Sequence, residues 1–126
     1  MLSIFVETSC NRYERDECIF CHVFEPLDPY DTRNLHLTPD QAKIMAEKIS
    51  QVDVLTQLAS QEINLTGGEV SMNPDIVEVF KAFSTISPNV CLHTNLDINS
   101  PKSKRWERLL KIIDLSGRID ITLYPT

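Results

Sequence analysis

Short apolar runs alternate along this chain with longer segments in which apolar residues recur every three or four positions. The short runs predict strands at residues 2–7, 62–66, 90–94 and 119–123. The longer segments predict helices that begin near residues 38, 73 and 100. The order β-α-β-α-β-α-β is typical of an α/β protein with a parallel sheet.

Local signals define where these helices begin and which face they bury. Thr38-Pro39-Asp40-Gln41 reads as an N-cap, a first-turn proline and a capping-box glutamine. One helix is expected from there to a point before Glu62. Its inward face is predicted to carry Ala42, Met45, Ile49 and Val52.

The next two helices carry similar signals. Asn73-Pro74-Asp75 predicts a helix start, and Ser100-Pro101 predicts another. Gly117 fits the exit of the last helix. The predicted inward residues are Ile76, Phe80 and Phe83 in the first of these helices and Trp106, Leu109, Leu110 and Ile113 in the second.

Three chemically distinctive segments each begin where a predicted strand ends. They are Cys10 to Cys21, Gly67 to Glu69, and Thr94-Asn95. Right-handed crossovers bring the carboxyl ends of parallel strands to one edge of the sheet, where α/β proteins form their sites. We therefore expect the three segments to converge.

Composition restricts the class of protein. A chain of 126 residues with 42% hydrophobic content builds one core, so residues 1–126 are expected to form one domain. Neither a long apolar run nor an export signal is present, which favours a cytoplasmic protein without membrane association. A net charge of −6 disfavours nucleic acid as a partner. The basic cluster is expected to be a solvated helical face, made of Lys102, Lys104, Arg105 and Arg108.

The cysteines carry the strongest chemical signal. Cys10, Cys18 and Cys21 crowd into one loop, whereas Cys91 lies in an apolar strand and is expected to fill the core. A structural zinc site normally has four protein ligands. Three thiolates instead match a 4Fe-4S cubane, in which one iron has no protein ligand. The alternative is a zinc-binding structural or interaction module that takes His22 or His36 as its fourth ligand.

These motifs together resemble the radical S-adenosylmethionine superfamily over nearly the whole chain. The resemblance rests on Glu7-Thr8-Ser9-Cys10-Asn11, Cys18-Ile19-Phe20-Cys21, Leu65-Thr66-Gly67-Gly68-Glu69 with Asn73-Pro74-Asp75, and Thr94-Asn95. Two features depart from the commonest pattern. Seven residues rather than three separate Cys10 from Cys18, and Leu96 replaces a glycine after Asn95.

The resemblance implies an incomplete (βα)6 barrel and a radical enzyme. Cys10, Cys18 and Cys21 would hold the 4Fe-4S cluster. S-adenosylmethionine would be cleaved reductively to a 5′-deoxyadenosyl radical that abstracts hydrogen from a substrate, with electrons from a donor such as flavodoxin or ferredoxin. The implied cofactor-binding residues are Phe20, Gly67, Gly68, Glu69, Thr94 and Asn95.

Several assignments stay open at this level. Asp120 and Thr122 are alternative ribose contacts, Tyr124 has no assigned role, and His93 is expected to be a hydrogen-bonded structural histidine. The fourth strand ends near Thr126, so either the natural chain continues to complete the barrel or another subunit covers that edge. By this interpretation the isolated fragment can lack activity. A further alternative is a member of the superfamily that has lost its catalytic activity and serves as an interaction scaffold. The sequence does not identify the substrate.

Overall fold

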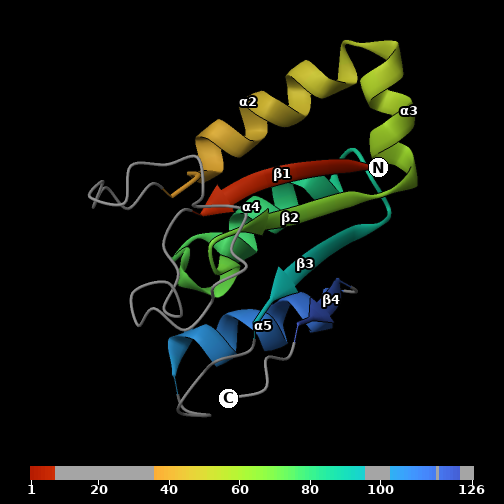
Figure 1. The fold of residues 1–126 in the computed structure, drawn as a ribbon. Helices are drawn as coiled ribbons and strands as arrows, with labels where there is room; N and C mark the ends of the chain where they lie inside the picture. The colour runs from red at the N-terminus through yellow and green to blue at the C-terminus, as the bar shows by residue number, and fades with distance from the viewer. Residues whose placement is uncertain (8–35, 96–102, 116, 123–126) are drawn as a thin grey trace, which may run out of the picture.

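A four-stranded parallel sheet forms the centre of the protein. The computed structural model describes residues 1–7, 36–95, 103–115 and 117–122. The strands follow one another in the order β1-β2-β3-β4 and comprise Leu2–Glu7, Ile63–Gly67, Val90–Thr94 and Arg118–Ile121. The predicted α/β class and parallel sheet are confirmed, and the described sheet is open rather than closed (Figure 1).

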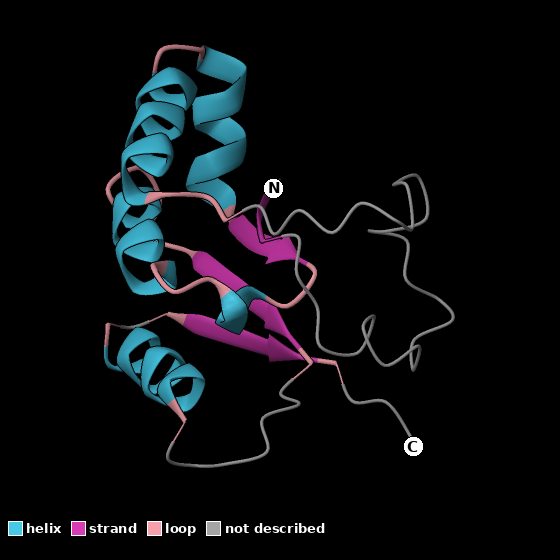
Figure 2. Ribbon diagram, turned by 90° about the vertical axis from the view of Figure 1, so that its left-hand side faces the viewer, coloured by secondary structure: helices cyan, strands magenta, loops and turns pink. Residues whose placement is uncertain are grey.

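Four helices lie on one side of this sheet (Figure 2). They are α2 (Pro39–Ser50), α3 (Asp53–Gln61), α4 (Ile76–Ser84) and α5 (Lys104–Asp114), and a short 3-10 helix, η1 (Val70–Met72), follows β2. No helix among the described residues combines the length and the apolar character needed to cross a bilayer.

The core lies between the helices and the sheet. Ile4, Leu65 and Leu92 are register partners on three neighbouring strands and are all buried. Alternate residues of a strand point to opposite faces, so this row faces the helices. Phe83 of α4 is fully buried in the same cluster, and burial of this apolar surface is the main term that stabilises the fold.

The start of α2 is as predicted, but its extent is not. Thr38 Oγ1 accepts a hydrogen bond from the Gln41 amide at 3.2 Å, and Gln41 Oε1 accepts one from the Thr38 amide at 3.0 Å. The single predicted helix is wrong because the chain divides at Val52, which is the N-cap of α3 and is 44% exposed. The buried residues of α2 are Ala42 and Ala46, which have small side chains.

The start of α4 depends on Asn73, which is fully buried. Asn73 Nδ2 donates to the carbonyl oxygens of Val6 at 2.8 Å and Leu37 at 3.1 Å, and Asn73 Oδ1 accepts from the Asp75 amide at 2.8 Å. One side chain therefore joins the end of β1 to the beginning of α4. The inward residues predicted for α4 are confirmed as Ile76, Phe80 and Phe83.

The inward face predicted for α5 is confirmed for Leu109 and wrong for Leu110 and Ile113. Leu109 and Ile112 are buried, whereas Leu110 is 52% exposed and Ile113 is 53% exposed. Ser103 caps the helix, and the predicted start at Ser100-Pro101 lies outside the described residues. The exit is as predicted, since the Gly117 amide donates to the Ile112 carbonyl oxygen at 2.9 Å.

Candidate functional site

The carboxyl ends of β1, β2 and β3 meet at one edge of the sheet. The Gly68 amide donates to the Glu7 carbonyl oxygen at 2.8 Å, so the glycine turn after β2 is fixed to the end of β1. Thr94, at the end of β3, contacts Glu69 of the same turn. The predicted convergence is confirmed for Gly67 to Glu69 and Thr94-Asn95.

The predicted cluster ligands Cys10, Cys18 and Cys21 lie outside the described residues, as does Phe20. The segment that contains them, residues 8–35, is flanked by Glu7 and His36, and these two residues form an antiparallel bridge. The Leu37 amide also donates to the Val6 carbonyl oxygen at 3.0 Å. The cysteine segment therefore leaves and rejoins the described fold at the same edge as the glycine turn.

Gly67 is required by the close approach of two strands. Its φ is +150°, and a Cβ at this position would lie 2.1 Å from the Glu7 carbonyl oxygen. No other residue type fits this geometry without moving the backbone. The sequence predicts that the missing side chain of Gly67 lets a cofactor approach the backbone. In the structure the end of β1 occupies the position next to the Gly67 Cα.

The Glu69 carboxylate is the centre of a buried hydrogen-bond network. Its side chain is fully inaccessible to solvent. Thr94 Oγ1 donates to Glu69 Oε2 at 2.7 Å, Ser71 Oγ donates to the same oxygen at 3.2 Å, and the Asn95 amide donates to Glu69 Oε1 at 3.3 Å. The carboxylate thus joins the ends of β2 and β3.

Two arginines of α5 complete this network. Arg105 Nη2 lies 3.6 Å from Glu69 Oε2, and Arg105 Nε donates to Ser71 Oγ at 2.9 Å. Arg108 Nη1 donates to the Ser71 carbonyl oxygen at 2.9 Å. The interpretation of the basic cluster as a solvated face is therefore wrong for Arg105 and Arg108, which bind η1, although Lys104 is exposed.

Burial governs the electrostatics of Glu69. Loss of hydration raises the pKa of the Glu69 carboxyl group, and the hydrogen bond from Thr94 and the charge of Arg105 oppose this rise. Because several donors within the protein already use the carboxylate, the geometry favours a role in holding the edge together. Direct contact between Glu69 and a cofactor stays a prediction.

Glu7 and His36 form a second polar contact at the same edge. The Glu7 side chain is fully buried, and one of its carboxylate oxygens is in hydrogen-bond contact with His36 Nδ1. The His36 side chain is 37% exposed. A histidine whose Nδ1 contacts a carboxylate has its Nε2 oriented for metal binding, an arrangement common around zinc.

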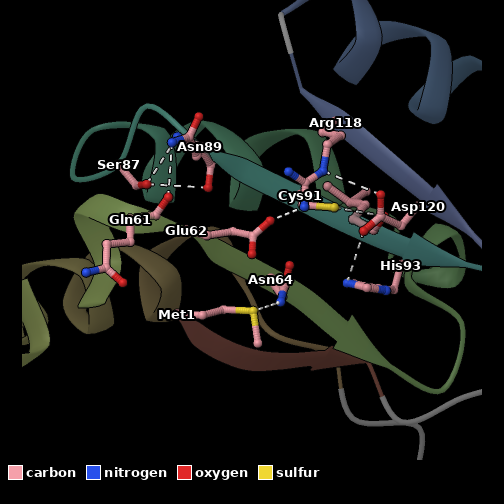
Figure 3. Close-up of polar contacts among 11 residues, drawn as sticks. Met1, Gln61, Glu62, Asn64, Ser87, Asn89, Cys91, His93, Arg118 and Asp120 are labelled. Atoms are coloured by element: carbon pink, nitrogen blue, oxygen red, sulfur yellow. Dashed lines mark hydrogen bonds and ion pairs between the residues drawn. The ribbon is translucent and has the colours of Figure 1, made fainter. Parts of the chain in front are cut away.

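Cys91 and His93 lie elsewhere, on β3, beside Asp120 of β4 (Figure 3). Cys91 is buried as expected, with 1% exposure, although it lies outside the hydrophobic cluster between the sheet and the helices, and His93 Nε2 lies 3.7 Å from Asp120 Oδ2. Burial raises the pKa of the Cys91 thiol, and a hydrogen bond to Asp120 raises it further. The same hydrogen bond lowers the pKa of Asp120.

Thr122 is the other residue that the sequence offers as a ribose contact. Its backbone amide donates a hydrogen bond to the Thr94 carbonyl oxygen at 2.9 Å.

Comparison with protein-family models, with curated proteins and with solved structures finds no match for this chain. Function is therefore argued from the sequence motifs and from the geometry of the described residues.

Proposed function

We propose that this chain is the core of a radical S-adenosylmethionine enzyme. In this proposal Cys10, Cys18 and Cys21 hold a 4Fe-4S cluster, and the adjoining sheet edge binds S-adenosylmethionine. The open sheet of the described residues would belong to a partial (βα)6 barrel. Thiolate ligands of this kind persist in a reducing compartment such as the cytoplasm.

The observation that carries the proposal is the shared edge. The cysteine segment leaves and rejoins the fold at Glu7 and His36, and the glycine turn is hydrogen-bonded to Glu7. A cluster and a nucleotide bound by these two segments would be neighbours.

The residues present fit the two cofactors in their donor chemistry. Three thiolates would leave one iron of a cubane without a protein ligand. The amino and carboxylate groups of the methionine part of S-adenosylmethionine could bind that iron. The chain supplies a polar edge at Gly68, Glu69 and Asn95, rigidly held by the network around the Glu69 carboxylate. Phe20 is assigned to the adenine by resemblance alone.

When bound and reduced, the cofactors supply carbon–sulfur cleavage, which gives methionine and a 5′-deoxyadenosyl radical that takes hydrogen from the substrate. The protein's part is placement. Gly67 allows β1 and β2 to approach each other, and Glu69 fixes the ends of β2 and β3 relative to each other. An external electron donor such as flavodoxin or ferredoxin is required.

Anaerobic reconstitution with iron and sulfide tests the cluster. We expect about four irons per chain with matching sulfide. The variants Cys10→Ser, Cys18→Ser and Cys21→Ser should lose most of this iron, whereas Cys91→Ser should retain it because Cys91 lies on a buried strand. Formation of 5′-deoxyadenosine after addition of S-adenosylmethionine and a reductant tests the reaction class. Protein that takes up zinc but no iron contradicts the proposal.

The role of Glu69 is tested by two substitutions. Glu69→Ala should weaken S-adenosylmethionine binding and spare the iron content. Glu69→Gln keeps the side-chain size, and its carbonyl oxygen can still accept the hydrogen bond from Thr94, whereas its NH2 group cannot accept the one from the Asn95 amide. Retained affinity in Glu69→Gln indicates a positioning role, whereas equal loss in both variants indicates direct contact with the cofactor's ammonium group. Glu78→Ala, on the exposed face of α4, is the matched control.

A zinc-binding module is the second candidate, and the His36–Glu7 contact favours it. A carboxylate at Nδ1 orients the imidazole for a metal at Nε2, which would make His36 the fourth ligand beside the three cysteines. His36→Ala separates the two candidates. Zinc affinity should fall sharply in this variant if zinc is the resident metal, whereas the reconstituted iron content should persist if the cluster is held by cysteines alone.

A further inference from the structure

The sheet presents a row of polar side chains on the face opposite the helices. Cys91 and His93 are two residues apart on β3, and the register pairs them with Arg118 and Asp120 of β4. Residues two apart on a strand share a face, and the intervening Leu92 is buried on the helix side. Figure 3 shows the side chains of Cys91, His93 and Asp120 gathered at one place on this face.

The spacing of these three side chains suits a metal ion. Cys91 Sγ, a ring nitrogen of His93 and a carboxylate oxygen of Asp120 all lie within 4.8 Å of one another. Ligand atoms around tetrahedral zinc are separated by about 3.3 to 3.7 Å. The distance of 3.7 Å between His93 Nε2 and Asp120 Oδ2 already falls in this range, so only small side-chain rotations are needed.

The charges around the group are also balanced for a divalent cation. A thiolate and a carboxylate together neutralise an ion of charge +2. The guanidinium of Arg118 is in hydrogen-bond contact with Cys91, and its own charge is balanced by Glu62, with which it forms an ion pair. Asp120 uses its two oxygens differently. Oδ1 lies 3.4 Å from Arg118 Nε, while Oδ2 faces His93. An outer partner that orients a ligating carboxylate in this way is typical of protein metal sites.

We propose that Cys91, His93 and Asp120 form a binding site for a borderline divalent transition metal, with Zn²⁺ as the best-suited ion. Sulfur, imidazole and carboxylate donors together favour zinc over magnesium or calcium. Three protein ligands leave one coordination position for water or a small ligand. The side chains of His93 and Asp120 are 39% and 43% exposed, so this position is accessible within the described chain. The site uses neither the proposed cluster ligands nor the glycine turn.

Cobalt binding tests the site in the full chain. The background protein carries Cys10→Ser, Cys18→Ser and Cys21→Ser, so that Cys91 is its only thiol. Titration with Co²⁺ should produce a thiolate-to-cobalt charge-transfer band that saturates at one equivalent and disappears when Zn²⁺ is added. Cys91→Ala should abolish the band. His93→Gln and Asp120→Asn should each weaken Co²⁺ affinity by about tenfold or more.

Matched controls make each outcome decisive. Asp53→Asn removes an exposed carboxylate from α3 and should leave Co²⁺ affinity unchanged. Because His93 and Asp120 are partly exposed, their variants should remain folded by circular dichroism even if Cys91→Ala does not. Absence of the band in the background protein overturns the site, as does unchanged affinity in both His93→Gln and Asp120→Asn. Since this background lacks the three cluster cysteines, either result is independent of iron uptake by the wild-type protein.

Discussion

Gly67 illustrates, at the scale of single residues, how the close approach of two strands requires a glycine. Its positive φ and the 2.1 Å approach of a Cβ to the Glu7 carbonyl oxygen leave no room for a side chain. Gly67→Ala is expected to lower the free energy of unfolding by roughly 2 to 4 kcal/mol, from backbone strain and overpacking. Urea denaturation measures this change.

The control for this substitution is Ser60→Ala, at an exposed position in α3. Alanine is favourable in a helix, so this variant should keep wild-type stability within about 0.5 kcal/mol. If Gly67→Ala matched Ser60→Ala, the close contact between β1 and β2 would not exist in solution.

Glu69 predicts a specific dependence of stability on pH. Burial raises its pKa above the ordinary value of 4.5, so between that value and the higher folded value the native state binds more protons than the unfolded chain. The contribution of Glu69 to stability is therefore most favourable below the ordinary pKa, and it declines as the pH rises through this window.

Glu69→Gln removes this titration. The free energy of unfolding of the variant, minus that of the wild type, should increase as the pH rises from about 4 to 8. Urea denaturation at several pH values measures the difference, and Glu78→Gln at an exposed position should show no such trend. A difference that stayed constant, or fell with rising pH, would mean that Glu69 is not destabilised as a buried carboxylate.

At the scale of helices and strands, the sequence predicted start signals better than buried faces. Thr38 Oγ1 and Asn73 Oδ1 each accept a hydrogen bond from an amide two or three positions further on, so these start signals follow from sequence. The bonds from Asn73 to Val6 and Leu37 join distant segments and do not. The face that α5 buries does not follow, because Leu109-Leu110 and Ile112-Ile113 offer two adjacent stripes of equal apolar character. Only the direction in which the helix meets the sheet selects Leu109 and Ile112.

The division between α2 and α3 escaped the sequence for a related reason. The apolar spacing continues smoothly through Ile49 and Val52, with no glycine or proline to mark an end. Of the expected inward residues, Ala42 is buried, Met45 and Ile49 pack against the core, and Val52 is exposed. The expected face is therefore present as far as Ile49, and the periodic pattern fails only at the break before α3.

The capping box of α2 provides a prediction at this scale. Thr38→Ala removes the hydroxyl that accepts the Gln41 amide and should lower the free energy of unfolding by about 1 kcal/mol. Thr38→Ser keeps the hydroxyl and should retain most of the stability. Thermal or urea denaturation of the two variants makes the comparison, and equal losses in both would indicate that the hydroxyl does not cap the helix.

At the scale of the whole molecule, topology made the candidate site predictable in part. Parallel strands place their carboxyl ends at one edge, so the meeting of Glu69 with Thr94 followed from strand assignments alone. The contribution of Arg105 did not, because it comes from a helix whose orientation the sequence left open. The Cys91–His93–Asp120 group was also missed. The two-residue spacing on β3 was visible, but the register with β4 was not.

The distribution of buried residues predicts that the molecule does not open as a single unit. Four of the five residues of β3 are buried, and α4 buries five side chains. In β4 every residue is exposed or half-buried, and α5 buries two side chains. Since local opening has the lowest free energy where the fewest apolar contacts are broken, β4 and α5 should open before β2, β3 and α4.

Native-state hydrogen exchange at increasing urea concentration tests this order. Amides of β2, β3 and α4 should exchange only through global unfolding, with a free energy equal to that from denaturation. Amides of α5 and the hydrogen-bonded amides of β4 should exchange at lower free energy and with a weaker dependence on urea, because their opening exposes less surface. If the β4 amides matched those of β2 in both quantities, the sheet and all its helices would form one cooperative unit. The contact of Arg105 with the Glu69 network would then be the first candidate for the coupling that holds α5 to the core.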